Sequence, residues 1–233
     1  MNMTHKTIGL FLKLALTTLV AVSPTFAQEA QGDEADVPWR VLVYSLQENN
    51  AEQEVTDLVR QGFLPVGFEI EPEDGSLSIL VVRRGDLEIE GWLIADYTDW
   101  NALEAEITGS IQSGLIPMDI SRYGDAIAIL WVQADIPVEG WRIHAAENTV
   151  TGRIRAVNQF QEQGFTVWGV SVHADLAWYL FMKQTGEQPT STVAAYAKDA
   201  NELQNGMVAS SRDGWLPNAF AITAEAFLVS YVK

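Results

Sequence analysis

Four polar side chains in the third quarter of the sequence are of types that bind ligands. Arg142 and His144 alternate with apolar residues along one expected strand, and Ser171 and His173 do so along another. Alternate residues of a strand point to one face, so all four share a face if the two strands are neighbours. Imidazole and guanidinium groups hold carboxylates or phosphates, and imidazole also binds metals. The pattern therefore predicts candidate ligand-binding residues for a small anion or metal, although the interpretation that we favour is an ordinary polar face, because two histidines are few for a site.

The local charge supports this prediction. Basic side chains outnumber acidic ones by one within residues 141–184, whereas residues 39–90 and 92–139 each carry a net charge of −7. The polar face that we favour would be the outer face of a sheet, with ordinary surface residues. We expect no resident metal or cofactor, because the chain has no cysteine and no zinc-ligand spacing.

Catalytic motifs do not occur in the context they need. Ser230 and Lys233 have the Ser-x-x-Lys spacing of penicillin-binding enzymes, but they fall at the end of an expected strand with no helix after them. The segment 169–173 approaches a nucleophile elbow, yet His173 stands where that motif needs glycine. We therefore predict no catalytic residues and favour a protein that is not an enzyme.

An internal repeat shows which elements must position these side chains. A glycine followed by a large apolar residue occurs four times, at Gly62, Gly114, Gly164 and Gly214, with spacings of 52, 50 and 50 residues. Tryptophans lie 22 or 23 residues before the first three of these glycines: Trp39, Trp92 and Trp141. Such regular spacing is typical of repeat proteins, whose units bury their apolar faces against one another.

Each unit has the same expected order of elements. An apolar strand comes first, a helix with an apolar stripe follows, and two further strands close the unit. The marker glycine is expected to end each helix, because glycine readily adopts the left-handed conformation. A strand-helix-strand step is normally right-handed, which places all helices on one side. The predicted fold is α+β, with four tandem βαββ repeats whose helices pack on one side of a mixed, curved β-sheet or half-barrel.

Helical spacing and capping residues give finer expectations. The predicted inward stripes are Val55, Leu58 and Val59; Leu103, Ile107 and Ile111; Ile154, Val157 and Phe160; and Leu203, Met207 and Val208. The predicted helix starts pair Asn50 with Gln53, Asn101 with Glu104, and Asp199 with Glu202. Trp100 comes just before one of these starts, where we expect it to be exposed.

Residues 1–27 have the features of a secretory signal peptide. Lys6 and Lys13 supply positive charge, a short apolar segment follows, and Ala27 ends a small-residue cleavage site. The apolar segment is too short to span a bilayer. The expected division is a signal peptide (1–27), an acidic flexible tail (28–38) and one repeat domain (39–233), with units at about 39–90, 91–139, 140–188 and 189–233. We expect the mature protein in the periplasm or outside the cell, without a membrane span.

The overall charge limits the possible partners. A net charge of −17 argues against nucleic acid, whose phosphates need a basic face, and against anionic membrane surfaces. The hydrophobic fraction of 48% indicates a folded chain despite this charge. Eight tryptophans are present, and repeat-spaced aromatics are expected in the core, although aromatic platforms also bind sugars and peptides. The expected partner is an unknown protein, peptide or saccharide.

The second unit carries a resemblance to a known repeat. Its motif residues, in order, are Trp92, Gly114, Pro117, Ile120-Ser121, Tyr123-Gly124 and Ile129-Leu130-Trp131. This pattern resembles the bacterial tandem repeat in the non-catalytic part of polyglycine-hydrolase-like secreted proteins. The resemblance covers all four units in layout, but the third unit has Val167 in place of the proline. It implies a repeat scaffold without catalytic residues.

Two other comparisons give alternative functions. The segment from Arg155 to Phe165 is similar to the helix-to-strand step of vicinal-oxygen-chelate enzymes, which would imply a small enzyme or metal-binding protein with a site in the third repeat. A cell-wall-binding fold of the sporulation-related type is also built from strand-helix-strand pieces. The favoured hypothesis is an exported, non-catalytic repeat protein that acts as a binding or interaction module.

Overall fold

The computed structural model describes residues 38–46, 51–71, 75–83, 87–186, 190–197, 199–223 and 226–233. The predicted signal peptide (1–27), all but the last residue of the acidic tail (28–38) and the predicted cap Asn50 lie outside these residues. None of the described helices combines the length and apolar character needed to cross a membrane.

The chain forms twelve strands and four helices within the described residues, and the predicted strand-helix-strand-strand order is confirmed four times. The first unit contains β1 (Trp39–Ser45), α1 (Ala51–Arg60), β2 (Phe63–Glu71) and β3 (Ser76–Arg83). The second contains β4 (Ile89–Tyr97), α2 (Trp100–Gln112), β5 (Leu115–Tyr123) and β6 (Ala126–Ala134). The third contains β7 (Val138–Glu147), α3 (Val150–Gln161), β8 (Thr166–His173) and β9 (Leu176–Gln184). The fourth contains β10 (Ser191–Ala197), α4 (Ala200–Arg212), β11 (Leu216–Ile222) and β12 (Ala226–Val232).

Each unit forms its own three-stranded antiparallel sheet, not a share of one mixed, curved sheet as the sequence suggested. The third strand of every unit lies between the first and the second, as in the order β1-β3-β2. The strand-helix-strand crossover leaves a space between the first and second strands. The third strand occupies this space, so every hydrogen-bonded pair is antiparallel. This arrangement leaves the second strand of each unit with one edge free of strand partners.

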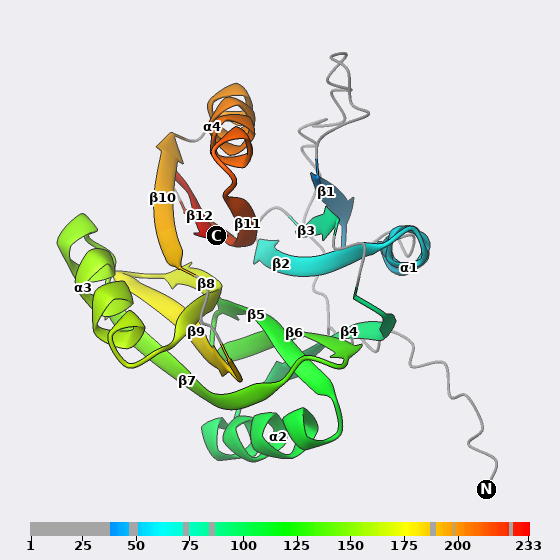
Figure 1. The fold of residues 1–233 in the computed structure, drawn as a ribbon. Helices are drawn as coiled ribbons and strands as arrows, with labels where there is room; N and C mark the ends of the chain where they lie inside the picture. The colour runs from blue at the N-terminus through cyan, green and yellow to red at the C-terminus, as the bar shows by residue number, and fades with distance from the viewer. Residues whose placement is uncertain are drawn as a thin grey trace, which may run out of the picture.

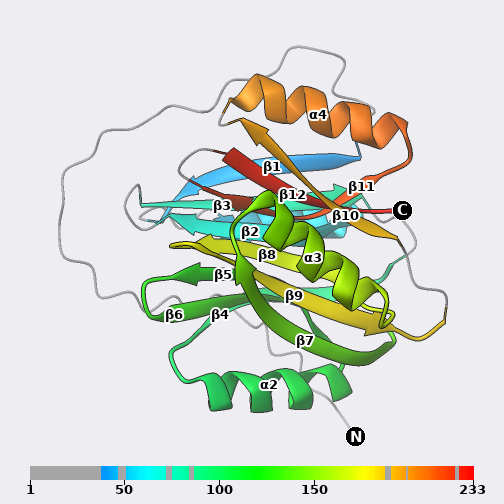
Figure 2. The ribbon, with the colours of Figure 1, turned by 90° about the vertical axis from the view of Figure 1, so that its left-hand side faces the viewer.

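Those free edges meet in the middle of the molecule. The second strands β2, β5, β8 and β11 contact one another in sequence, and β11 contacts β2, so the four units close into a ring. Figure 1 shows these four strands at the centre and the four helices around the outside. Figure 2, turned by 90°, shows α2, α3 and α4 along the outer side of the strands. The main apolar core contains buried residues from all four units.

The marker glycines end their helices as predicted. Gly62, Gly114, Gly164 and Gly214 all have positive φ, between 79° and 86°. The left-handed conformation turns the chain from the outer helix directly into the central strand. The repeat of these glycines therefore sets the same helix-to-strand turn four times.

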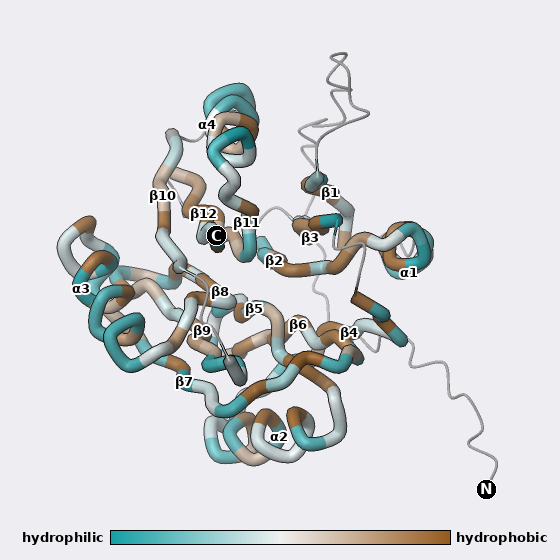
Figure 3. The backbone as a smooth tube through the Cα atoms, viewed as in Figure 1, coloured by the Kyte–Doolittle hydropathy of each residue, from teal (hydrophilic) through white to brown (hydrophobic). Residues whose placement is uncertain are grey.

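The helices bury one face each, and Figure 3 shows hydrophilic residues along their outer sides. Val55, Leu58, Leu103 and Ile107 are buried as predicted. The prediction for the third helix is partly wrong, because Ile154 is 55% exposed while Val157 and Phe160 are buried. The buried residues of α3 are Ala156, Val157 and Phe160, so Ala156 takes the place on the buried face that was predicted for Ile154.

The caps differ in detail from the predicted ones. Asp99, not Asn101, is the N-cap of α2, and its carboxylate accepts from the amides of Asn101 and Ala102. Asp199 caps α4 as predicted. Thr149 caps α3 through the amide of Gly152. An aspartate or threonine oxygen replaces the missing helical acceptor at the first turn in each case.

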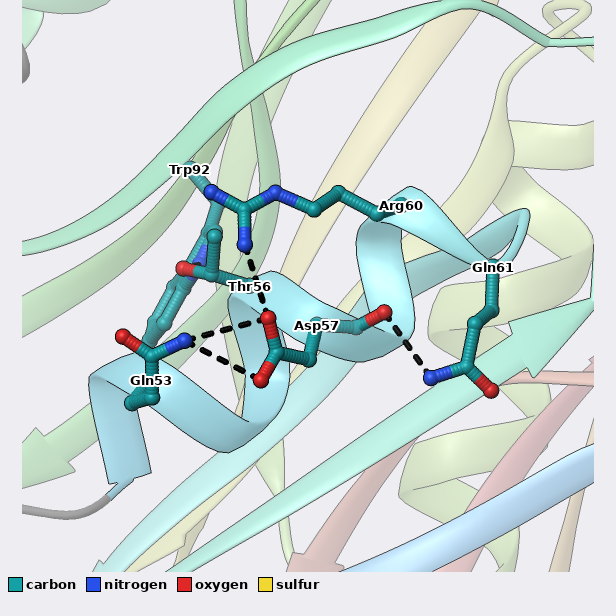
Figure 4. A network of polar contacts seen from close by, with 6 residues as sticks. All are labelled: Gln53, Thr56, Asp57, Arg60, Gln61 and Trp92. Atoms are coloured by element: carbon teal, nitrogen blue, oxygen red, sulfur yellow. Dashed lines mark hydrogen bonds and ion pairs between the residues drawn. The ribbon is translucent and has the colours of Figure 1, made fainter.

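The tryptophans of two first strands, Trp39 on β1 and Trp92 on β4, connect their units to the helix of the unit before. Trp92 Nε1 donates to Thr56 Oγ1 on α1 at 3.1 Å, beside the polar side chains of that helix shown in Figure 4. Trp39 Nε1 donates to Ser211 Oγ on α4 at 3.1 Å, although 172 positions separate the two residues. The first unit therefore contacts the helix of the fourth, as the second contacts the helix of the first, although Ser211 lies three positions before its marker glycine and Thr56 lies six positions before its own.

Candidate functional site

Asp119 occupies the centre of the ring and is fully buried. Its Oδ2 accepts from the amide of Phe68 at 2.7 Å, and its Oδ1 accepts from the amides of Ile120 at 2.8 Å and Val170 at 2.9 Å. These amides come from three units, on strand edges that no other strand covers. Burial raises the pKa of Asp119 well above its ordinary value, and the amide donors oppose that effect. The Asp119 carboxylate therefore supplies the acceptors that these strand-edge amides need, which is a structural role.

A second polar layer repeats the arrangement two residues further along the strands. Ser121 Oγ donates to Glu69 Oε1 at 2.8 Å and accepts from the amide of Ile70 at 3.3 Å. Ser171 Oγ accepts from the amide of Arg122 at 2.8 Å. Burial raises the pKa of Glu69 well above its ordinary value, and the Ser121 hydroxyl lowers it by less. The buried hydroxyls of Ser121 and Ser171 thus serve as acceptors for the edge amides of a neighbouring unit.

The structure does not bring the four predicted site residues together. Strand β9 lies between β7 and β8, so the strands that carry them are not neighbours. His144 pairs with Tyr179 on β9, whereas Ser171 pairs with Trp178, the adjacent residue. Adjacent residues of a strand point to opposite faces, so Arg142 and His144 lie on one face of the sheet and Ser171 and His173 on the other. The condition for one shared site is therefore not met.

Arg142 and His144 have aromatic neighbours in place of an anion. The His144 ring lies 5.1 Å from the Phe160 ring of α3. Arg142 lies over Phe165 at 5.7 Å, and its Nη1 donates to the carbonyl of Trp141. Both side chains thus face their own helix. The described residues contain no group of three or more His, Cys, Asp or Glu side chains that could hold a metal ion.

A different cluster lies between the second and third units, formed by Trp100, Trp178 and Arg122; we call it the tryptophan–arginine cluster. The Trp100 and Trp178 rings are 6.3 Å apart and inclined by 53°. The Arg122 guanidinium lies over the Trp178 ring at 5.4 Å. Trp100 is 38% exposed, as the sequence suggested, and the other two residues are partly buried. Three elements contribute, since Trp100 begins α2, Arg122 belongs to β5 and Trp178 to β9.

Each member of the cluster departs from the repeat. The residues equivalent to Arg122, eight positions after their marker glycines, are all apolar: Ile70, Val172 and Ile222. The residues equivalent to Trp178 in the register of the second and third strands are Ser78, Ala128 and Leu228. The other three helices begin with Ala51, Val150 and Ala200. Three residues that depart from the repeat therefore meet in space, at the boundary between the second and third units.

The Arg122 side chain lacks polar partners. Its Nε is buried and has no hydrogen-bond partner among the described residues. The ion pairs found among those residues join Arg60 to Asp57 and Lys183 to Glu139, and none includes Arg122. Arg122 is also the single basic residue between positions 92 and 139. The buried Nε–H is therefore a donor without an acceptor, and the guanidinium forms no ion pair within the described part of the chain.

Sequence reasoning missed this cluster because it took each tryptophan by itself. The repeat pattern predicts that aromatic residues lie in the core, and it gives no particular role to Trp178 or Arg122. The signal that finds the cluster is a comparison of equivalent positions, which the marker glycines make possible. No protein-family model matches the chain, and no curated protein matches it.

Proposed function

We propose that the protein is an exported, non-catalytic binding module whose ligand occupies the tryptophan–arginine cluster. The observation that carries the proposal is the meeting of three residues that break the repeat, one of them an exposed tryptophan. Tryptophan and arginine are the residues most enriched in the energetic centres of binding surfaces. The proposed export rests on the leader-like residues 1–27.

The alternatives have less support. A metal or catalytic site in the third unit needs Arg142, His144, Ser171 and His173 close together, and these lie on two faces of a sheet. The buried acids Glu69 and Asp119 are hydrogen-bonded inside the ring, where they complete strand edges. A cell-wall partner remains compatible with the proposal, because it would be one source of ligand for the same cluster.

The proposal is tested by binding to glycan and peptide arrays and to purified peptidoglycan. Wild-type protein is compared with a Trp100→Ala/Trp178→Ala double variant and with a Trp215→Ala control. Trp215 is a matched control because Lys233 lies over its ring at 5.7 Å. This gives a second pair of a cation and a tryptophan, at a distance in the sequence from the cluster. We expect wild type and the control to retain one class of ligand and the double variant to lose it.

Two results would contradict the proposal. One is a double variant that keeps its far-UV circular dichroism spectrum and binds the same array features as wild type. The other is a wild-type protein that retains nothing on the arrays or on peptidoglycan above an unrelated acidic protein. Export is tested separately by N-terminal sequencing of protein from the medium or periplasm, where we expect a chain that begins near Gln28.

A further inference from the structure

We infer that the ligand of the tryptophan–arginine cluster is a ring that carries a carboxylate, with the ring stacked on Trp100 and the carboxylate paired with Arg122. This inference rests on the proposed function and adds the chemical class of the ligand to it. Its two parts come from different observations, one on charge and one on exposed aromatic surface.

The charge of the ligand follows from Arg122. The buried Nε–H has no acceptor among the described residues, and no described carboxylate lies within ion-pair distance of the guanidinium. A guanidinium presents a planar fork of donors, and a carboxylate presents two oxygens that match it. A ligand cannot reach the buried Nε, so a carboxylate on the ligand would pair with the Nη groups, which are not among the buried atoms without a partner.

The ring of the ligand follows from the two indoles. Arg122 already covers part of Trp178, and Trp178 lies against Trp100 at an inclined angle. The 38% exposed Trp100 therefore offers the open aromatic surface of the cluster. Indole faces stack against other aromatic rings and against the apolar faces of sugar rings. Trp178 neighbours both Trp100 and Arg122, at 6.3 Å and 5.4 Å, so a ligand that stacks on Trp100 and pairs with Arg122 would bind across Trp178.

Other ligand classes fit less well. A pair of tryptophans often suits a cation, but here the guanidinium over Trp178 repels one. A small inorganic anion meets the long-range repulsion of a chain with net charge −17 and gains no stacking energy. The ligand therefore needs both features, the charge for Arg122 and the flat surface for Trp100.

Two pairs of probes test the contribution of the charge separately from that of the ring. They also distinguish a sugar acid from an aromatic acid. Methyl β-glucuronide is compared with methyl β-glucoside, and phenylacetate with phenylacetamide. Within each pair the ring is the same and only one member has a carboxylate. Binding is measured by calorimetry and by tryptophan fluorescence with the full chain. We expect the acid of one pair to bind about tenfold or more tighter than its neutral partner.

The variants assign this preference to the cluster. Arg122→Gln is expected to bring acid and neutral probe to equal affinity, and Arg122→Lys to keep only part of the difference, because lysine lacks the fork. Trp100→Ala is expected to weaken both members of the preferred pair. Lys233→Gln, beside Trp215, is the control and is expected to keep the wild-type preference.

The outcomes distinguish this inference from the proposed function. If neither acid binds more tightly than its neutral partner to wild type, the inference is overturned. An acid preference that survives in Arg122→Gln overturns it as well. In both cases the proposed function still stands if the array ligand is lost in the Trp100→Ala/Trp178→Ala variant, and it fails if that variant binds like wild type.

Discussion

Asp119 lies where the free edges of the central strands meet, and three amides from three units donate to it. No equivalent residue can do this, because the matching positions are Gly67, Gly169 and Ala219. Gly169 leaves room for this carboxylate, because a Cβ there would lie 2.7 Å from Asp119 Oδ1, whereas a Cβ at Gly67 would meet the backbone of Ala219 and Phe220. A repeat protein thus uses one exception to its pattern to complete its axis.

Substitution of Asp119 by alanine should be strongly destabilising. It leaves three buried amides without acceptors, each at a cost of about 1–3 kcal/mol. We expect the free energy of unfolding in urea to fall by about 3 kcal/mol or more. Asp125→Ala, at an exposed turn, is the control and should change stability little. Equal stability of the two variants would show that the amides find other acceptors.

Glu69→Gln should stabilise the protein at neutral pH. Burial raises the pKa of Glu69, so the folded state of the wild type loses stability as pH rises from the unfolded-state pKa, about 4.3, through the folded-state pKa. Glutamine keeps the acceptor for Ser121 but does not titrate. The free energy of unfolding of the variant should equal that of the wild type below pH 4. Above that pH it should exceed the wild-type value by an amount that grows by up to about 1.4 kcal/mol per pH unit. Urea melts from pH 4 to 8 measure it, and an advantage that is constant with pH contradicts the expected burial effect.

At the scale of elements, the close approach of β8 to β5 and of β2 to β11 depends on Gly169 and Gly67. A Cβ at Gly169 would lie 2.7 Å from Asp119 Oδ1 and 2.9 Å from the backbone nitrogen of Ile120. Backbone atoms of a packed strand cannot move away readily. The contact between β5 and β8 therefore requires glycine at this position, although the φ angle does not.

Two glycine-to-alanine substitutions test this point. Gly169→Ala should lower the free energy of unfolding by about 1–3 kcal/mol through overpacking. Gly109→Ala, on the exposed face of α2 with nothing within 4 Å of the added Cβ, should raise it by about 0.5–1 kcal/mol. Thermal and urea unfolding of both variants give the comparison. A neutral or stabilising Gly169→Ala would mean that β5 and β8 are less tightly packed than the structure indicates.

At the scale of the whole molecule, the first and last units are neighbours. Trp39 donates to Ser211 on α4, and Trp92 donates to Thr56, which lies about one turn further from its marker glycine on α1. A ring has no end unit, so the contact between first and fourth units should be as important as an internal one. An open array would place Trp39 at a free end.

Trp39→Phe and Trp92→Phe should therefore cost similar amounts. Each substitution removes one hydrogen bond and replaces an indole by a phenyl ring, so we expect the free energy of unfolding to fall by about 1 kcal/mol or more for both. Fluorescence and far-UV circular dichroism should show one cooperative transition. If Trp39→Phe has no effect while Trp92→Phe destabilises the protein, the ring is open in solution.

The sequence alone determined the order of elements, the four helix-ending glycines and most of the buried helix faces. These features depend on local chemistry: periodicity, the left-handed conformation of glycine and residues that cap helices. The same local reasoning misplaced Ile154, because a stripe of apolar residues does not say where the buried sector of a helix ends.

Only the tertiary structure decided how the units meet. The sequence pattern places Arg142 and Ser171 on one face only if their strands are neighbours, and β9 lies between those strands. Asp119 and Glu69 carried no local signal, because Asp119 accepts from the amide of Phe68, 51 positions away, and Glu69 accepts from the hydroxyl of Ser121, 52 positions away. Trp100, Arg122 and Trp178 come together through the packing of two units, and contacts between units follow from the closure of the ring, which no single repeat encodes.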